Sequence, residues 1–348
     1  MTGKIIHKPA TIRDVARLAK VSIGTVSKAL NDSGKLKPET RARVIAEAKK
    51  LGFRPNDLAL SLHRGHSLTV GVITTDSFGR FTMPIVEGLE AQLSDGGISV
   101  FLCNATDDRE REARHVESLL GKRVDGIVVT ARRSDRRPAL QVPVSRVPVL
   151  YAFSQTDDPD ALSLLPDDEG GARRATEHLI AVGRRRIAHV TGPEHFEAVQ
   201  LRRDGYRAAL KAARVPAPAG YFLAGAWSEA WGREALDRLF VRGRSVPDGI
   251  FCGNDQIARG IIDGLRERGI TVPDAVSIVG FDNWEIIAAA TRPPLTSIDM
   301  NLKELGREAG RRLLERIAGA RLRGVHRLPC SLIVRESCGA GRPDRRET

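Results

Sequence analysis

The sequence lacks long apolar runs and has few cysteines. No run of about 18 apolar residues occurs in its 348 residues, which argues against a membrane span. The first ten residues contain Lys4 and Lys8 but no apolar core typical of a signal peptide, so we expect a cytoplasmic protein. The four cysteines show neither CxxC nor Cys/His spacing, which predicts free thiols and no metal site: Cys103, Cys252, Cys330 and Cys338.

Motifs of phosphate binding and catalysis are also missing. Neither a phosphate loop nor a GxGxxG motif lies between an expected strand and an expected helix. No Ser/His/Asp or metal-binding set is apparent, because His178 falls on an expected helix and His189 within an expected strand, where a structural role is the simpler interpretation. We therefore expect no enzymatic activity and no cofactor.

Positive charge is present in excess, and it is concentrated at the N-terminus. Residues 1–64 hold 14 Lys and Arg against 5 Asp and Glu, whereas the rest of the chain holds 41 against 38. Such a basic segment is typical of phosphate binding, although a solvated basic surface would show the same charge. The length favours two or three domains, and the 41% apolar content is sufficient for packed cores.

The basic segment predicts three short helices. Thr11 and Asp14 form the pattern of a capping box before the first helix, and Ser22 can cap a second helix that ends near Leu30. A third helix is expected from Pro38 to about Leu51, with Gly52 just beyond it. Two helices joined by so tight a turn indicate a helix-turn-helix, with a generic three-helix interaction module as the alternative.

The run from Thr11 to Ile73 resembles the signature of the lactose-repressor (LacI/GalR) family. The resemblance implies that the second helix lies in the major groove of operator DNA. It places Ile23, Gly24 and Lys28 at base edges, while Thr25, Ser27 and Asn31, with the capping residues Thr11 and Ser22, position the backbone. The chemistry agrees, because lysine can donate to guanine and isoleucine can contact a thymine methyl group, while glycine offers no side chain.

The resemblance also covers a hinge segment over 56–66. It implies a helix that forms only on DNA, in which Asn56, Ala59 and Leu62 contact the minor groove and the leucine acts as an apolar wedge. A flexible linker is the alternative, because so short a segment is not helical by itself. Leu60 and Asp57 depart from the family pattern, and an acid beside phosphate is unfavourable.

From residue 67 onward, short apolar strands alternate with helices, which predicts an α/β body with parallel sheets covered on both faces. The expected domains are a helical head over 1–55, the hinge, a two-lobed effector-binding and dimerisation body over 67–338, and a disordered tail over 339–348. The body resembles the family's effector region, which is similar to type I periplasmic sugar-binding proteins. We expect three crossings between lobes, near Leu165, Ser297 and Leu328. The resemblance is carried by EHLIAVGRRRIAHVTGP, RRDGYRAAL, CGNDQIARGIIDGLRERGITVPDAVSIVGFDN and PPLTSIDMNLKELGREA.

Ligands of such sheets bind beyond the carboxyl ends of the strands. The resemblance implies effector-binding roles for Phe81, Phe153, Arg202, Trp227, Asn254, Asp255 and Asp282. Alternatives are helix capping for the aspartates, a surface position for Arg202 and core packing for Trp227. Phe153 and Thr82 depart from sugar-binding relatives and make the pocket less polar. We expect a carbohydrate or glycoside effector, with a nucleoside or another metabolite as the second possibility.

No leucine heptads follow the body, and a helix-turn-helix reads palindromic DNA best in pairs, so a homodimer is expected. The sequence thus predicts an effector-controlled DNA-binding regulator, most simply a repressor released by its ligand. A solute-binding protein without regulatory function would leave the helix-turn-helix unexplained. A DNA-binding protein that has lost its effector is the other alternative.

Overall fold

Local sequence signals fix the small N-terminal unit. The computed structural model describes residues 10–31, 33–53, 66–142, 147–241, 243 and 245–340, and its two compact units are Met1–Leu68 and Thr69–Thr348. The first unit contains α1 (Ile12–Ala19), α2 (Ile23–Leu30) and α3 (Pro38–Lys50), all three as predicted. They share an apolar core centred on the fully buried side chains of Val15, Ala19, Val26 and Val44.

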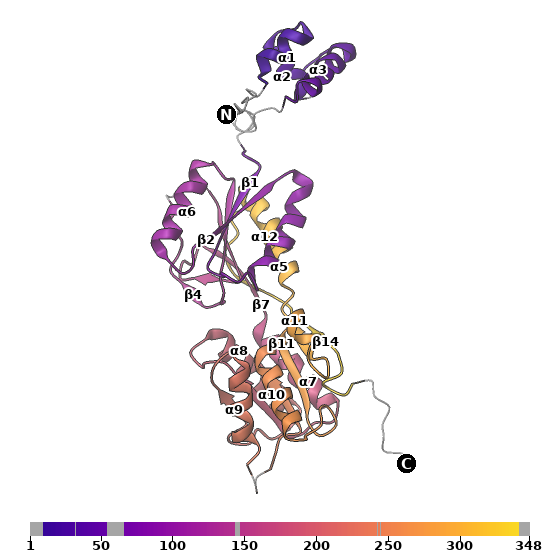
Figure 1. Cartoon of the computed structure of the whole chain (residues 1–348). Coiled ribbons are helices and arrows are strands. Elements are labelled where there is room, and N and C mark those ends of the chain that lie inside the picture. The colour runs from indigo at the N-terminus through magenta and orange to yellow at the C-terminus, as the bar shows by residue number, and fades with distance from the viewer. Residues whose placement is uncertain are drawn as a thin grey trace, which may run out of the picture. The chain divides into compact units, whose positions relative to one another are not determined.

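The second unit consists of two lobes, each built on a parallel sheet (Figure 1). The first lobe has the strand order β13-β7-β5-β3-β1-β2, and all neighbouring strands are parallel. Helices α5 and α12 pack on one face and α6 on the other, because alternate strand residues enter separate cores. The bounds are β1 Thr69–Thr74, β2 Ser99–Asn104, β3 Gly126–Thr130, β5 Val149–Ala152, β7 Leu162–Pro166, β13 Gly324–Leu328, α5 Thr82–Leu93, α6 Arg109–Gly121 and α12 Leu302–Ile317.

The second lobe has the strand order β14-β12-β11-β10-β8-β9, in which only β14 is antiparallel to its neighbour among the described strands. Helices α7 and α8 contribute to the core on one face, and α9 and α10 to the core on the other. The bounds are β8 Ile187–Thr191, β9 Phe222–Ala224, β10 Gly249–Cys252, β11 Ser277–Asp282, β12 Thr296–Asp299, β14 Ser331–Ile333, α7 Asp168–Ala181, α8 Glu197–Ala212, α9 Glu229–Leu239, α10 Asp255–Glu267 and the short α11 Glu285–Ala288.

The chain passes between the lobes three times, as predicted. It crosses after β7, after β12 and after β13, which is within a few residues of the three expected points. A small two-stranded sheet, β4 (Arg136–Arg137) with β6 (Gln155–Thr156), lies beside the first sheet. Loops follow the carboxyl ends of β1, β3 and β5 in the first lobe and of β8, β10 and β11 in the second. These loops therefore lie near the crossings, where polar side chains of both lobes meet.

Helix pairs in the body approach closely through glycine. A Cβ atom on Gly88 of α5 would lie 1.8 Å from the carbonyl oxygen of Lys303 in α12. One on Gly306 of α12 would lie 2.1 Å from the carbonyl oxygen of Ile85 in α5. Any side chain at either position would force the two helices apart. The helices of the first lobe are thus held in a tight packing that fixes the loop before α5.

Candidate functional sites

The outer face of α2 presents the residues that the sequence assigned to base contacts. Ser22 caps the helix, since its hydroxyl accepts a hydrogen bond from the Thr25 amide at 3.1 Å. Ile23, Gly24 and Lys28 are exposed, and Ile23 is 45% exposed although it is apolar. Val26 and Ala29 face inward and are buried. The side chains of Ile23 and Lys28 are therefore free to contact another molecule.

Several neighbouring polar side chains already have partners within the head. The Ser22 and Thr25 hydroxyls lie 2.9 Å apart, and the Asn31 amide donates to the Ser27 hydroxyl at 3.3 Å. Asp14 accepts from the amide of Thr11 at 3.0 Å and from its hydroxyl at 2.7 Å. These residues therefore order the head. Their contacts to DNA stay a prediction, and the hinge positions Asn56, Ala59 and Leu62 lie outside the described residues.

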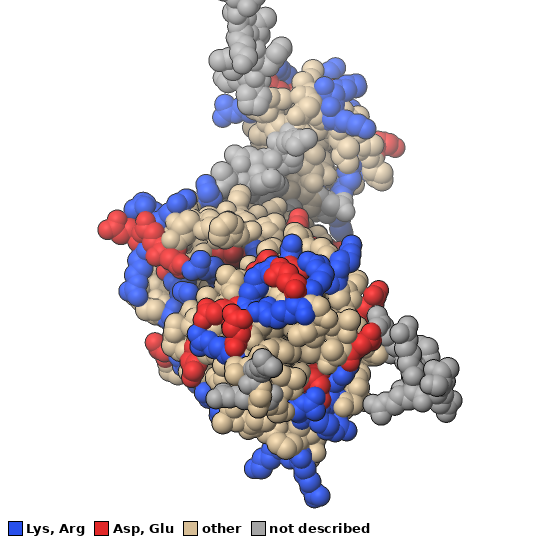
Figure 2. Space-filling model, turned by 60° about the horizontal axis from the view of Figure 1, so that its bottom comes forward, with Lys and Arg blue, Asp and Glu red and all other residues tan. Residues whose placement is uncertain are grey.

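The Lys28 side chain extends from α2 over the turn that contains Gly34. Gly34 has a φ of +71°, and a Cβ atom there would lie 3.3 Å from the Lys28 Cδ, so the lysine stem passes over the glycine. Within the described part of the head, its ammonium group has no hydrogen bond or ion pair. Figure 2 shows lysine and arginine side chains at the surface of the head with few acids, whereas both signs are interspersed over the visible face of the body.

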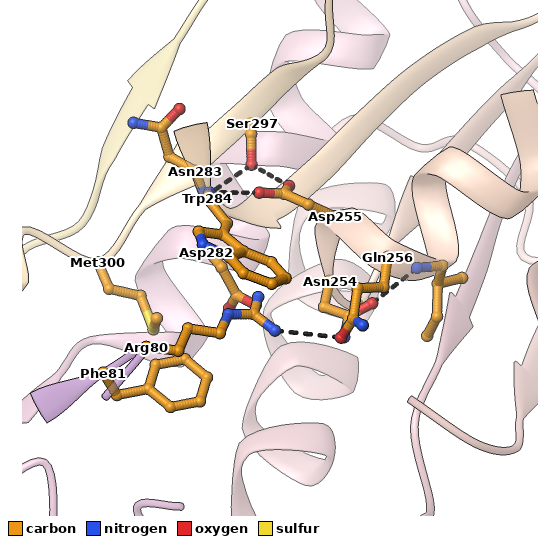
Figure 3. A network of polar contacts seen from close by, with 12 residues as sticks. Arg80, Phe81, Asn254, Asp255, Gln256, Asp282, Asn283, Trp284, Ser297 and Met300 are labelled. Carbon is orange, nitrogen blue, oxygen red and sulfur yellow. Dashed lines mark hydrogen bonds and ion pairs between the residues drawn. The ribbon is translucent and has the colours of Figure 1, made fainter. Parts of the chain in front are cut away.

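In the body, two of the predicted effector positions, Phe81 and Asp282, contact a residue that the sequence analysis missed, Arg80. Its guanidinium forms an ion pair with Asp282 and donates to the Gln256 side-chain oxygen at 3.1 Å, so this loop of the first lobe bonds to the second lobe (Figure 3). The guanidinium carbon also lies 4.3 Å from the ring centre of Trp284 and 4.9 Å from that of Phe81. Arg80 thus ties the two lobes together at the cleft.

The aromatic positions occupy both sides of this contact. Phe81 stacks on Phe153 with ring centres 4.9 Å apart, and both belong to the first lobe. Trp227 lies on the backbone of Gly192 directly after β8, because a Cβ on that glycine would come within 2.1 Å of the indole. It is only partly buried, so core packing does not use the whole ring.

Arg202 is not a surface cation, since only 5% of it is exposed. Its Nε donates to Asp168 at 2.8 Å, and its Nη1 donates to the Gly253 carbonyl oxygen. The guanidinium carbon lies 3.7 Å above the Phe281 ring and 5.9 Å from that of Trp227, and Nη2 is 3.9 Å from Asp282. Most of its donors are therefore already satisfied within the second lobe. Asp168, its main partner, was also missed by the sequence analysis.

The three acidic and amide positions of the second lobe have different roles. Asn254 caps α10 by accepting from the Ile257 amide at 2.8 Å, a role that the sequence analysis considered for the aspartates and not for this residue. Asp255 accepts from the Trp284 amide at 2.6 Å and from the Ser297 hydroxyl at 2.5 Å (Figure 3). Burial, followed by repulsion from Asp282, raises the pKa of Asp255 to about 8. Burial also raises the pKa of Asp282, against the influence of its two arginines.

Phe153 and Asp282 share an unusual backbone. Their φ angles are +55° and +100°, a region that side chains with a Cβ rarely adopt. Both residues come at or directly after the carboxyl end of a central strand. Such strained positions tend to occur at binding sites, where the surrounding structure holds a side chain in place.

Four buried polar atoms around the cleft lack a hydrogen-bond partner among the described residues. They are the hydroxyl oxygens of Thr130, Ser154 and Thr191 and the Nε of Arg80. Thr130 ends β3, Thr191 ends β8 and Ser154 follows β5, so all belong to the strand ends of the two lobes. A buried polar group without a partner costs roughly 1–3 kcal/mol, so these atoms are open to a ligand. Of these four residues, Arg80 lines a pocket of about 450 Å³ together with Phe81, Trp284, Asp282 and Met300 among others, and Ser154 lines a second, smaller pocket.

Replacing Asp255 by asparagine is expected to flatten the pH dependence of stability. The folded-state pKa of about 8 exceeds the ordinary value of 3.8, so the folded protein keeps a proton that the unfolded chain releases. This contribution to stability is complete below about pH 4 and is lost as the pH rises towards 8. Melting temperatures measured from pH 5 to 8 should therefore fall less in Asp255→Asn than in the wild type, and parallel curves would contradict the shift.

The described ranges contain neither a candidate membrane span nor a candidate metal site. None of the helices there is both long and apolar enough to span a membrane. No group of three or more His, Cys, Asp or Glu side chains in the same ranges is arranged to hold a metal ion.

Comparison with known proteins gives two family matches. Residues 11–56 match the model of bacterial regulatory proteins of the lacI family, and residues 176–338 match a periplasmic binding protein-like domain. The ribose operon repressor of Escherichia coli K12 is 35% identical over 311 residues, which span 88% of this chain and 93% of that protein.

Solved structures agree with these matches. The lac repressor dimer bound to operator and the anti-inducer ONPF aligns with a TM-score of 0.79 and 29% identity, covering 95% of this chain and 99% of that one. The transcriptional regulator CelR in complex with cellobiose aligns with a TM-score of 0.64 and 30% identity, covering 94% and 99% of the two chains.

Proposed function

Because the chain belongs to the lacI family of bacterial regulatory proteins, and is therefore a DNA-binding transcriptional regulator, we propose that it is a repressor that a carbohydrate releases from its operator. The observation that carries the ligand half of this proposal is the set of unpartnered buried polar atoms at the strand ends of both lobes. The DNA half is supported by the exposed face of Ile23, Gly24 and Lys28 on α2.

The cleft favours an uncharged polyhydroxy group. Arg80 and Arg202 face Asp168 and Asp282, so their formal charges balance. Asp255 adds little negative charge at neutral pH, because its pKa is about 8. Three hydroxyl groups without partners and the rings of Phe81 and Trp227 resemble the combination of polar contacts and flat apolar surface that sugars require.

Control of DNA binding would pass through the relative orientation of the lobes. Arg80 belongs to the first lobe, whereas Asp282 and Gln256 belong to the second, so a ligand that takes over one of these contacts alters how the lobes are tied. Such a ligand shifts the balance only by its different affinity for the two arrangements, typically 1–3 kcal/mol. We propose that the ligand-bound arrangement disfavours the hinge geometry needed on DNA.

A test uses the full chain in two steps. Selection from random duplex DNA should recover palindromic sites. Thermal melting with ribose, glucose, cellobiose and adenosine should then show which class stabilises the protein, because a ligand that binds only the folded state raises its stability. Recovery of no specific site would refute the DNA half, and stabilisation by adenosine alone would replace the carbohydrate with a nucleoside.

Dimerisation is proposed at the β2 edge of the first lobe. Phe101 and Leu102 of this edge strand are 42% and 46% exposed, and Met83 of α5 is 53% exposed. Exposed apolar side chains grouped on neighbouring elements are typical of protein interfaces. The alternative is that the β2 edge is exposed to solvent and that the dimer interface lies elsewhere.

Leu102→Glu is expected to weaken the dimer by at least about tenfold, since it buries a charge in an apolar interface. The matched control is Val325→Glu on β13, the opposite edge strand, where the valine is also 46% exposed. Sedimentation equilibrium should show more monomer for Leu102→Glu and none of this shift for Val325→Glu. Equal behaviour of the two variants would place the interface elsewhere.

A further inference from the structure

A second, smaller pocket of about 200 Å³ lies at the carboxyl ends of the strands of the first lobe. Its walls include Thr75 after β1, Ala131 after β3 and Ser154 after β5, together with residues at the start of α6 and an arginine-rich loop. We propose that this pocket is a subsite for an anionic oxygen group, a phosphate or a carboxylate. The proposal rests on the proposed function, because it assigns the subsite to the effector.

The Ser154 hydroxyl is an unused hydrogen-bonding group in the wall of the pocket. Its side chain is fully buried, it lines the pocket, and its hydroxyl has no hydrogen-bond partner among the residues that the structure describes. A hydroxyl in this position can donate to an anionic oxygen, which is one of the stronger classes of hydrogen bond. The ligand group that completes it must therefore reach the inner wall of the pocket.

Two of the five arginines around the pocket have free guanidinium groups. Arg137 is paired with Glu112, Arg133 lies 3.8 Å from Asp135, and Arg136 lies 3.7 Å from Asp157. By contrast, Arg109 and Arg132 form no ion pair or hydrogen bond with any described residue, and both are exposed enough to move. Their planar forks match the geometry of a phosphate or carboxylate group.

The acidic side chains of the pocket do not outnumber its arginines, and most of them have partners of their own. Asp108 caps α6 by accepting from the amides of Glu110 at 2.9 Å and Arg111 at 3.1 Å. Asp135 accepts from the Glu197 amide at 2.9 Å, and Glu112 pairs with Arg137. The amide partners of Asp108 are neutral and leave its charge in place, so the lining in total holds five arginines against four acids: Asp107, Asp108, Glu112 and Asp135.

The position of the pocket connects it to the cleft. Ser154 follows Phe153, whose ring stacks on Phe81 at the wall of the larger pocket. In the proposed arrangement, one molecule places its hydroxyl groups against the aromatic wall and its anionic group against Arg109 and Arg132. This identifies the effector class as a phosphorylated or carboxylated sugar. A free anion that binds beside a neutral sugar has the same chemistry, and the experiment below separates the two sources.

The test measures binding of glucose, glucose 6-phosphate, ribose, ribose 5-phosphate and inorganic phosphate to the full-length protein by calorimetry. The variants are Arg109→Gln/Arg132→Gln and Ser154→Ala, with Arg114→Gln as the control, because Arg114 is an exposed arginine on α6 outside the pocket. At least one phosphate ester should bind roughly tenfold or more tightly than its parent sugar, and both pocket variants should abolish that advantage. The control should retain it.

Inorganic phosphate that binds by itself and strengthens binding of the neutral sugar would instead assign the subsite to a free anion, still through Arg109 and Arg132. Unchanged affinity for every anion in the double variant, or no anion binding at all, would overturn the proposal. Failure of the proposed function looks different. In that case the wild type would still bind the phosphate ester and the pocket variants would bind it more weakly. Binding of the ester would, however, leave operator affinity unchanged.

Discussion

Arg202→Ala is expected to lower the free energy of unfolding of the body by about 3–5 kcal/mol, the cost of leaving a buried charge without its partner. Asp168 is 1% exposed, and its carboxylate lies 2.7 Å from the Arg202 Nη2. Burial raises the pKa of Asp168, and Arg202 is the main opposing influence. Removing the arginine also exposes the carbonyl oxygen of Gly253 and the face of Phe281 to empty space.

Urea unfolding of the full chain measures this effect. The matched control is Arg203→Ala, the neighbouring arginine, which pairs with the exposed Asp204 at 3.2 Å and should change stability by less than about 0.5 kcal/mol. Adding Asp168→Asn to Arg202→Ala should recover part of the loss, because no unpaired charge is then buried. If Arg202→Ala has the same free energy of unfolding as the wild type, the contacts of the arginine do not stabilise this lobe.

Lys28→Ala is expected to weaken binding to a selected operator by about 1–3 kcal/mol for each half-site, which is the discrimination carried by a good base contact. The loss should be specific to sequence, since the lysine is proposed to read a base edge. Thermal stability and ligand binding should be unchanged, because its ammonium group has no partner in the described part of the head.

The control for this variant is Lys49→Ala, which removes the same charge from the last turn of α3. It should reduce affinity for all DNA sequences by a similar small factor, as expected for a charge that acts only through phosphate. Fluorescence anisotropy with the selected site and with a scrambled site separates the two behaviours. If Lys28→Ala lost the same affinity for both DNAs, the lysine would not be a residue that recognises a base.

Much of the fold follows from local sequence. Buried strands such as β8 (Ile187–Thr191) are short and mostly apolar, and the alternation of such strands with helices predicted the α/β body. The helices of the head were predicted from their caps and glycines. In contrast, β13 (Gly324–Leu328) has mostly exposed side chains, and β14 has only three residues, so neither has a pattern that distinguishes it from a loop.

The site was predicted less completely, for a physical reason. The sequence indicated which residues stand at strand ends but not how they pair across the lobes. Arg80 lies in the loop between β1 and α5, and its position next to the predicted Phe81 was the available signal. Its pairing with Asp282, 202 positions further along the chain, depends on the crossings between the lobes. The same applies to Arg202, whose donors are largely used by Asp168.

We propose that a molecule bound between the lobes controls the affinity of the head for DNA. Its most direct test is a titration of the operator complex of the full-length protein, followed by anisotropy, with the compound that most raises the melting temperature. Operator affinity is expected to fall by about 5–150-fold at saturation, which corresponds to a coupling of about 1–3 kcal/mol. A compound that saturates the body while operator affinity stays constant would contradict it.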